Sequence, residues 1–544
     1  MKKTKRISLI AMLLVLVMLV SACGSSGGKK TSGSSANVSA PNEFPIVDEP
    51  TTLTVFVAKP ATLEDLETNE FTKWYEEKTG IKIEWHYVTG NTRQSINLQI
   101  ASGNFPDIFL GFNFSRAEQA AYYDQGVFVD MSDLIEEHGY NIKKMFEKYP
   151  EMEKELRHTD GTILGLPSGV QDFSNETSYK MWVYKPWMEK LGAEMPETTE
   201  EFYELLKRFK NEDPNGNGKA DEIPLAGRNM RGNPVGLDVF IMNSFTTWTR
   251  FGYYNDNGTA KFAPTSDEAK EGIRFMRKLY KEGLIHPESF SMDRARITAL
   301  AENDVPILGM APGKWTTQFT LAGATSGRMN DYVAISPLKG PGGVQQTIGE
   351  GLDLGQTSFS ITSNCKNPEA AIKWIDWFYS EEGYLQGYAA EGMRKANEGE
   401  LGLDGTQAIY ALDEVDAPAT GTVQNERWID FAPCFVPVEG TIKIKNNTID
   451  ATRLANAYDA HKLYEPYLVA KGTTFLDFPM ALEECEEYLE LRSNITAAID
   501  SGFASFVIGE KDIDKDWDEY VKNFESLGVE RYLQIVQKYL DTQK

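Results

Sequence analysis

The first folded part of the chain alternates between apolar runs and mixed segments in a regular order. Residues 53–57 (Leu-Thr-Val-Phe-Val) are mostly apolar, which predicts a strand. Between Asn69 and Gly80, aromatic residues recur on one helical face, and glycine is typical of the position just past a helix end. Apolar and polar residues then alternate over 81–87, which predicts a second strand. Strand, helix, strand is the unit of a parallel α/β sheet.

Further along, the pattern predicts more elements of both kinds. A helix and a turn are expected before a buried strand that reaches Phe109. Residues 126–130 predict another short strand or an extended edge. Thr198 and Glu201 have the spacing of a capping box. Residues 367–368 (Asn-Pro) are typical of a helix start and precede apolar residues that share one face.

Length and charge narrow the functional classes. The chain has 544 residues, enough for two sizeable cores, and a net charge of -25. This charge argues against a nucleic-acid partner, although a local basic pocket could still bind an acidic ligand. Histidines and cysteines show no metal-ligand spacing, and no glycosidase pair of carboxylates stands out. A G-x-S-x-G match at 24–28 has no strand before it and no helix after it, so we reject it as an esterase motif. Since no other catalytic pattern stands out, we predict that the chain is not an enzyme.

The N-terminus predicts secretion and lipid attachment. Residues 1–22 combine basic residues, a short apolar run and small residues, as a secretory signal peptide does. The following Cys23 makes this segment similar to a bacterial lipobox, which implies a lipid on Cys23 and a membrane anchor. Residues 23–49 begin with a Gly/Ser/Lys-rich stretch and are expected to form a flexible linker. The alternative is an ordinary cleaved signal followed by a chance cysteine.

Residues 213–222 (DPNGNGKADE) carry the sharpest local motif. Oxygen-bearing side chains alternate, and glycine at the sixth position allows a sharp turn, as a calcium shell made of oxygen ligands requires. The twelfth position, where an EF-hand has glutamate, is Pro224, so this is only the start of an EF-hand pattern. The alternative is a plain Asn-Gly turn. The predicted calcium ligands are Asp213, Asn215, Asn217, the Lys219 carbonyl, Asp221 and Glu222.

Several segments together resemble a known family. They read LQIASGNFPDIF, GVFVDM, MWVYKPWMEKLGAEMPETTEEF, NPEAAIKWIDWFYSEEGY, FVIGEKDIDKDW and YLQIVQKYLD. In this order and spacing they resemble bacterial extracellular solute-binding proteins of the sugar-binding class. More narrowly, they are similar to the large Gram-positive lipoproteins that serve oligosaccharide ABC importers.

The resemblance implies an α/β, two-lobe, periplasmic-binding-protein-like fold of type II, with a hinge and with the ligand in the interlobe cleft. One lobe would comprise 50–168 plus 350–395, and the other 169–349 plus 396–544. The resemblance also implies one structural calcium ion, a location on the extracellular face of the cell membrane, and a monomer. Its partners would be an oligosaccharide and ABC permease subunits. A uronate- or peptide-binding relative and a lipoprotein glycosidase are the alternatives.

Candidate ligand residues come from two arguments. Aromatic faces stack on sugar rings, and Trp315 stands where the family places such a residue, while Trp248 and Trp428 lie in polar surroundings. For each tryptophan, core packing is the alternative. Open α/β sheets place ligands beyond the carboxyl ends of strands, and for these polar residues loop solvation is the alternative. They are Lys59, Asn113, Gln171, Asp172 and Glu350.

Overall fold

The predicted strand, helix, strand order is present in the computed structural model, which describes residues 37–321, 326–349, 357–415, 423–428, 432–448, 451–475 and 477–543. Strands β1 (Thr51–Val57) and β2 (Ile81–Tyr87) run parallel, joined by α2 (Glu70–Thr79). The Asn69 side chain accepts a hydrogen bond from the Thr72 amide at 3.2 Å and caps this helix. Gly80 follows its last turn with φ 75°, the left-handed conformation that glycine adopts at least cost.

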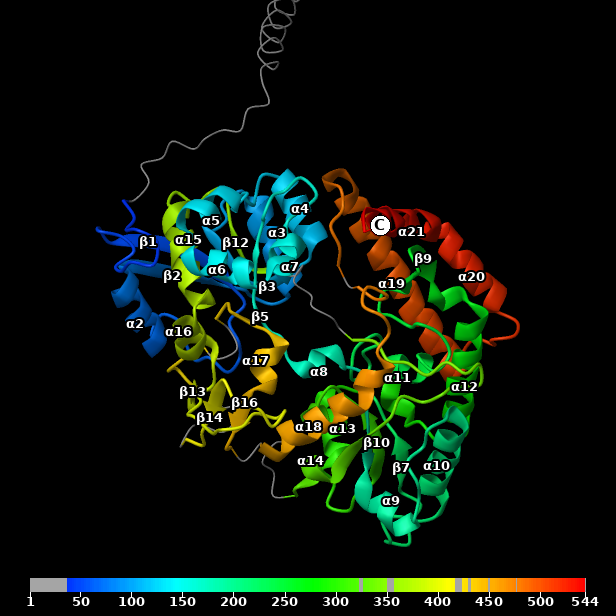
Figure 1. Cartoon of the computed structure of the whole chain (residues 1–544). Coiled ribbons are helices and arrows are strands. Elements are labelled where there is room, and N and C mark those ends of the chain that lie inside the picture. Colours follow the sequence, from blue (N-terminus) through cyan, green and yellow to red (C-terminus); the bar gives the residue numbers. More distant parts are fainter. Residues whose placement is uncertain are drawn as a thin grey trace, which may run out of the picture. The chain divides into compact units, whose positions relative to one another are not determined.

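The first lobe is built on a mixed five-stranded sheet in the order β2-β1-β3-β12-β4 (Figure 1). Its other strands are β3 (Ile108–Phe114), β4 (Leu166–Pro167) and β12 (Thr357–Ile361), which runs antiparallel to both neighbours. The predicted helix after Asn367 is α15 (Pro368–Asp376), which buries Trp374 in the core beneath this sheet. Residues 126–130 contribute one isolated bridge, from Phe128 to Thr362.

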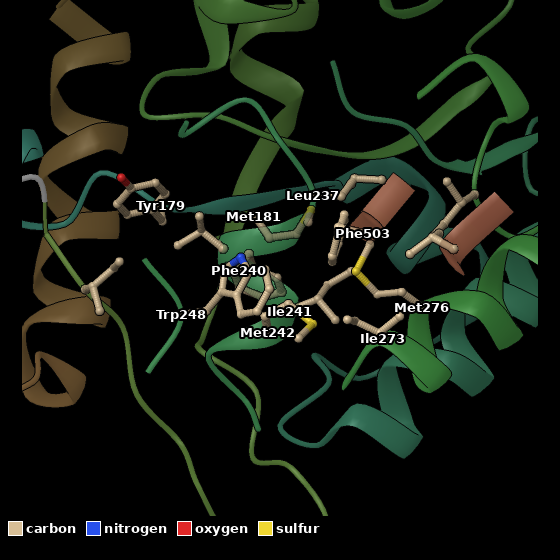
Figure 2. Packing of buried hydrophobic residues seen from close by; sticks show 14 of the residues in the cluster. Tyr179, Met181, Leu237, Phe240, Ile241, Met242, Trp248, Ile273, Met276 and Phe503 are labelled. Atoms are coloured by element: carbon tan, nitrogen blue, oxygen red, sulfur yellow. The ribbon is translucent and has the colours of Figure 1, made fainter. Parts of the chain in front are cut away.

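The second lobe is built on a four-stranded sheet in the order β11-β6-β10-β7. The strands are β6 (Met181–Tyr184), β7 (Ile223–Leu225), β10 (Leu308–Pro312) and β11 (Tyr332–Ile335). Helix α10 (Thr199–Asn211) starts with the predicted capping box of Thr198 and Glu201. Figure 2 shows part of this lobe's core, where Trp248 and Phe503 lie among aliphatic side chains.

Helices surround both sheets. Those that accompany the first sheet are α3 (Thr92–Ser102), α4 (Arg116–Asp124), α5 (Ser132–His138), α6 (Tyr140–Lys148) and α7 (Pro150–Leu156). Those of the second lobe include α9 (Lys185–Leu191), α11 (Asp238–Met242), α12 (Asp267–Lys281), α13 (Arg294–Ala301), α18 (Ala451–Tyr464), α19 (Cys485–Ile508), α20 (Trp517–Ser526) and α21 (Val529–Thr542). Among the described residues, none of the helices has the length and apolarity needed to cross a membrane.

Two segments pack outside the lobe and linker boundaries that were expected from the sequence. Val47 and its neighbour Ile46 are buried in the first core, and the Lys373 ammonium donates to the Ser39 carbonyl at 2.6 Å. The folded body therefore begins before residue 50, within the segment expected to be a linker. Residues 424–428, expected in the second lobe, also pack on the first core, because Gln424 pairs with Leu63 and Trp428 is buried there.

Candidate functional site

The carboxyl ends of β1, β3 and β4 lie at one edge of the first sheet, since these strands run in the same direction. Lys59 follows β1, but its ammonium donates to the carbonyls of Leu63 and Glu64, the latter at 2.8 Å, so it braces its own loop. Asn113 lies near the end of β3, exposed and with φ 49°, a left-handed conformation that asparagine tolerates. This edge therefore presents the exposed Asn113 amide, while Lys59 is held back.

Gln171 and Asp172 leave the same edge and lead toward the second lobe. The Gln171 amide donates to the Val436 carbonyl at 2.6 Å, in the small ladder formed by β5 (Gly169–Val170) and β15 (Phe435–Val436). The Asp172 carboxylate accepts from the Ser174 amide at 2.8 Å and starts the short helix α8 (Phe173–Glu176). Asp172 thereby fixes the position of the next residue, Phe173.

Phe173 belongs to an aromatic group of four residues, which we call the Trp315 group: Phe173, Trp315, Tyr458 and His461. The Phe173 ring meets the Trp315 indole edge to face at 5.8 Å, and meets the Tyr458 ring at 5.5 Å. Trp315 is only half-buried, and the guanidinium of Arg453 lies 5.1 Å from its ring centroid. A partly exposed indole among other rings and polar groups is the kind of surface that sugars stack on.

The loop after β10 holds Trp315 firmly. The Trp182 indole donates to the Gly313 carbonyl at 2.7 Å, and the Gly313 amide donates to the Lys180 carbonyl at 3.0 Å. A side chain on Gly313 would come within 2.9 Å of the Trp315 carbonyl oxygen. Nearby, burial lowers the pKa of His461, which favours a neutral imidazole. These hydrogen bonds fix the backbone before Trp315, and the lowered pKa of His461 favours a group with little charge of its own.

Of the predicted ligand residues, Trp315 belongs to this group and Asp172 caps the helix that begins with Phe173, whereas Phe173 and the residues on α18 were not among the predictions. Tyr458 and His461 lie on that helix about 290 residues after Phe173, and no local pattern links the two segments. Phe173 directly follows the predicted residues Gln171 and Asp172. Its place at the end of a strand crossover was therefore the one feature of the sequence that could have marked it as a candidate.

Trp248 and Trp428 do not lie in a site that a ligand reaches. Trp248 is 0% exposed and lies in the core shown in Figure 2. Its indole donates to the buried Asp238 carboxylate at 2.9 Å. Trp428 is 1% exposed, and its indole donates to the Thr72 hydroxyl at 2.8 Å. Because a stacked sugar needs a free ring face, the predicted ligand contacts of both tryptophans are wrong in this conformation. Their alternative assignment, core packing, is correct.

The 213–222 loop folds back around its acidic residues. The Asp213 carboxylate accepts from the amides of Asn217 and Gly218, each at 3.1 Å, and the Asp221 carboxylate accepts from the side chain of Asn215 at 2.8 Å. Asp213 has φ 48°, and both glycines of the loop are left-handed as well. The loop is therefore a tight turn with its carboxylates directed inward.

Glu222 provides a test of whether this loop fits a cation. Its Oε1 atom is buried and has no hydrogen-bond partner among the described residues. Burial raises the pKa of Glu222, and the charges of Asp213 and Asp221 raise it further. An unpartnered buried carboxylate oxygen beside two other carboxylates is the environment that a bound cation relieves. No cluster of three or more His, Cys, Asp or Glu side chains that could hold a metal occurs in the described residues, so amide and carbonyl oxygens would have to complete the shell.

Two predicted functional residues, Cys23 and Glu350, lie outside the described residues. Among the described residues, the cysteines at 365, 434 and 485 form no disulfide.

Comparison with known proteins gives the family. The family model of the bacterial extracellular solute-binding protein matches residues 58–384, more than half of the chain. The chain belongs to this family. As a solute-binding protein it has the expected two-lobe α/β fold, and a crystal structure of an extracellular solute-binding protein from Bifidobacterium longum subsp. infantis agrees. That structure has a TM-score of 0.75 and 26% identity, over 91% of this chain and 98% of its own.

A curated relative matches the solute-binding protein from end to end. It is the fructooligosaccharide ABC transporter substrate-binding protein FusA of Streptococcus pneumoniae, 28% identical over 99% of this chain and 98% of its own length. A solved structure of FusA, described as an EF-hand mutant in complex with fructo-nystose, covers 90% of this chain and 99% of its own, with a TM-score of 0.74 and 24% identity.

Proposed function

We propose that this chain is the substrate-binding component of an ABC importer and that its ligand is an oligosaccharide. The observation that carries the proposal is the half-buried Trp315, held edge to face by Phe173 at the carboxyl end of β10. Rigid aromatic faces of this kind bind the C–H face of a pyranose or furanose ring at little cost in conformational entropy. The end-to-end similarity to FusA supports the importer assignment.

In the proposed mechanism the two lobes close on the sugar. Trp315 supplies the stacking face, while Asn113, Gln171, Asp172 and Glu350 supply hydrogen bonds to hydroxyls. The ligand stabilises the closed form by its additional contacts there, and the permease recognises that form. The expected monomer is sufficient for this cycle. The chain transports its ligand unchanged, which separates it from a lipoprotein glycosidase.

Two accessory features belong to the same proposal. Cys23 carries a lipid that holds the protein on the extracellular face of the membrane, as the lipobox-like sequence indicates. The 213–222 loop binds one structural calcium ion through Asp213, Asn215, Asn217, the Lys219 carbonyl, Asp221 and Glu222. The unpartnered Glu222 Oε1 supports the ion, which would neutralise the three carboxylates and stiffen the second lobe.

The test is a melting-temperature screen against plant and host oligosaccharides, followed by calorimetric titration of each glycan that raises the melting temperature. We expect at least one neutral oligosaccharide to bind, and chromatography after long incubation to recover it intact. Binding of peptides or uronates alone would replace the oligosaccharide assignment. Slow cleavage of the glycan would replace the transport assignment with an enzymatic one.

A further inference from the structure

A pocket of about 360 Å³ lies in the second lobe, beyond the carboxyl end of β7. This position is where open α/β sheets place ligands, and the volume suits a small molecule. None of the predicted sugar contacts lines it. Its walls come from the loop after β7, from α11 and the loop that follows it, from the 3-10 helix η2 (Pro287–Phe290) and from α19. They include Arg228, Arg231, Arg250, Asp238, Phe290 and Phe503.

Arg231 is a largely buried cation of this pocket, which we call the arginine pocket. Its side chain is 7% exposed; its Nε pairs with the Asp500 carboxylate, and its Nη2 donates to the Arg250 carbonyl at 2.7 Å. Its Nη1 is buried and has no hydrogen-bond partner among the described residues. A buried guanidinium nitrogen without an acceptor is costly, so this geometry leaves one donor available to an occupant of the pocket.

Arg228 supplies a second donor on the same wall. Its Nε is also buried without a partner among the described residues. Burial lowers the pKa of Arg228, and the positive charge of Arg294 lowers it further. An anion near Arg228 would therefore relieve both an unmade hydrogen bond and a repulsion between like charges.

The acidic residues of the pocket are already engaged. The Asp238 carboxylate accepts from the Gly232 amide at 2.9 Å and from the Trp248 indole at 2.9 Å, while Asp500 is paired with Arg231. The loop is also fixed, since a side chain on Gly236 would come within 2.4 Å of the Met230 carbonyl oxygen. Although the whole chain has a net charge of -25, three arginines and two aspartates line this pocket, so its wall carries an excess of positive charge.

We propose that the arginine pocket binds the carboxylate or phosphate group of a small anionic solute, with Arg228 and Arg231 as the donors. Guanidinium groups match both oxyanions because their planar forks donate parallel hydrogen bonds. The rings of Phe290 and Phe503 offer an apolar wall for the rest of the molecule. This site uses residues that do not take part in the proposed oligosaccharide contacts, and it does not depend on that function.

The experiment is calorimetric titration of the complete folded chain at physiological ionic strength with three probes. Galacturonate and galactose differ only in one carboxylate, and inorganic phosphate tests the other oxyanion. We expect galacturonate or phosphate to bind while galactose does not. Binding by phosphate alone identifies an inorganic ligand, and binding by galacturonate identifies a carboxylate-bearing one.

Variants assign the binding to the pocket. Arg228→Gln should weaken it at least tenfold without lowering the melting temperature, because the Arg228 side chain makes no hydrogen bond among the described residues that would be lost. Arg231→Lys keeps the charge but loses the Nη1 donor, and it should weaken binding as well. Lys207→Gln removes one charge from the exposed face of α10 and should leave binding unchanged.

Two outcomes would overturn the proposal: no oxyanion binds, or Arg228→Gln and Lys207→Gln weaken binding equally. Titration with the neutral oligosaccharide found in the melting screen reports separately on the proposed transport function.

Discussion

At the scale of single residues, Trp315 is the side chain on which the proposed sugar site depends most. Trp315→Ala should weaken the cognate oligosaccharide roughly tenfold to a hundredfold, because a stacked indole contributes about 1–3 kcal/mol. The melting temperature should change little, since the indole is only half-buried. Calorimetric titration and melting curves on the same preparation measure both effects.

Trp374 provides the matched control for this prediction. It is 1% exposed in the core beneath the first sheet, so Trp374→Ala should cost roughly 3–5 kcal/mol of stability, with weaker binding only as a consequence. If instead Trp315→Ala bound normally and melted much earlier, the indole would be a core residue and the sugar site would lie elsewhere.

The tryptophans also show how far single residues can be interpreted from sequence. Trp248 and Trp428 stand among polar neighbours in the sequence, yet both are buried. Burial is tolerated because each indole N–H has an acceptor, which for Trp248 is Asp238, ten residues before it. For Trp428 that acceptor is Thr72, 356 residues away, which no local pattern reveals. A strand end and a glycine loop precede Trp315, and these local signals agree with its half-buried position after β10.

His158 gives a residue-scale prediction about pH. It is 5% exposed; burial lowers its pKa to about 4, and the nearby charge of Arg116 adds to this effect. In the unfolded chain its pKa is near 6.5, so the unfolded state binds more protons between pH 6.5 and pH 4. The contribution of His158 to the free energy of unfolding is complete above pH 6.5. It is lost as the pH falls from 6.5 to 4, which lowers the free energy of unfolding by up to ~3 kcal/mol.

Denaturant unfolding of the parent and of His158→Gln at several pH values measures this contribution. The difference between the two proteins should change across pH 6.5 to 4 and stay constant above that range. A constant difference throughout would mean that the pKa of His158 is the same in the folded and unfolded chains.

At the scale of elements, local signals determined the short-range structure well. Asn69, Gly80 and the pair Thr198 and Glu201 act as caps through neighbours within a few residues, so the helices they bound were predictable. Strand β12 was not, because it enters the first sheet about 240 residues after β3 and antiparallel to it. The packing of residues 424–428 on the first core has the same origin, which is pairing between distant segments.

The 213–222 loop gives the prediction that belongs to one element. Chelation should lower the melting temperature, and added calcium should restore it. Asp213→Ala should abolish this sensitivity, but it also removes the acceptors for the amides of Asn217 and Gly218. A cleaner variant is therefore needed beside it.

Glu222→Gln is that variant, because it removes a charge that the other carboxylates repel. In chelator it should melt at or above the temperature of the parent, since the charges of Asp213 and Asp221 disfavour an ionised Glu222. When calcium is added, the melting temperature of Glu222→Gln should rise much less than that of the parent, since one calcium ligand has been weakened. Identical melting curves of the parent with calcium and with chelator would exclude a structural ion.

At the scale of the whole molecule, the first question is where the protein resides. If Cys23 carries the lipid, Cys23→Ala should release the protein into the medium or leave its precursor unprocessed in the native host. Membrane fractionation and gel mobility distinguish these results. A Cys23→Ala protein that stays in the membrane fraction with unchanged mobility would show that something else anchors it.

The second whole-molecule prediction concerns closure on the ligand. A bound sugar can shift the two-lobe chain toward a closed form only through contacts that exist there and are absent from the open form. Small-angle scattering should therefore show a smaller radius of gyration with the cognate oligosaccharide than with a sugar that does not bind. Trp315→Ala at a saturating ligand concentration should still close, because the proposed hydrogen-bonding residues Asn113, Gln171 and Asp172 remain in place. Tight binding with an unchanged radius would mean that recognition by the permease does not depend on closure, and the transport mechanism proposed here would need a different signal.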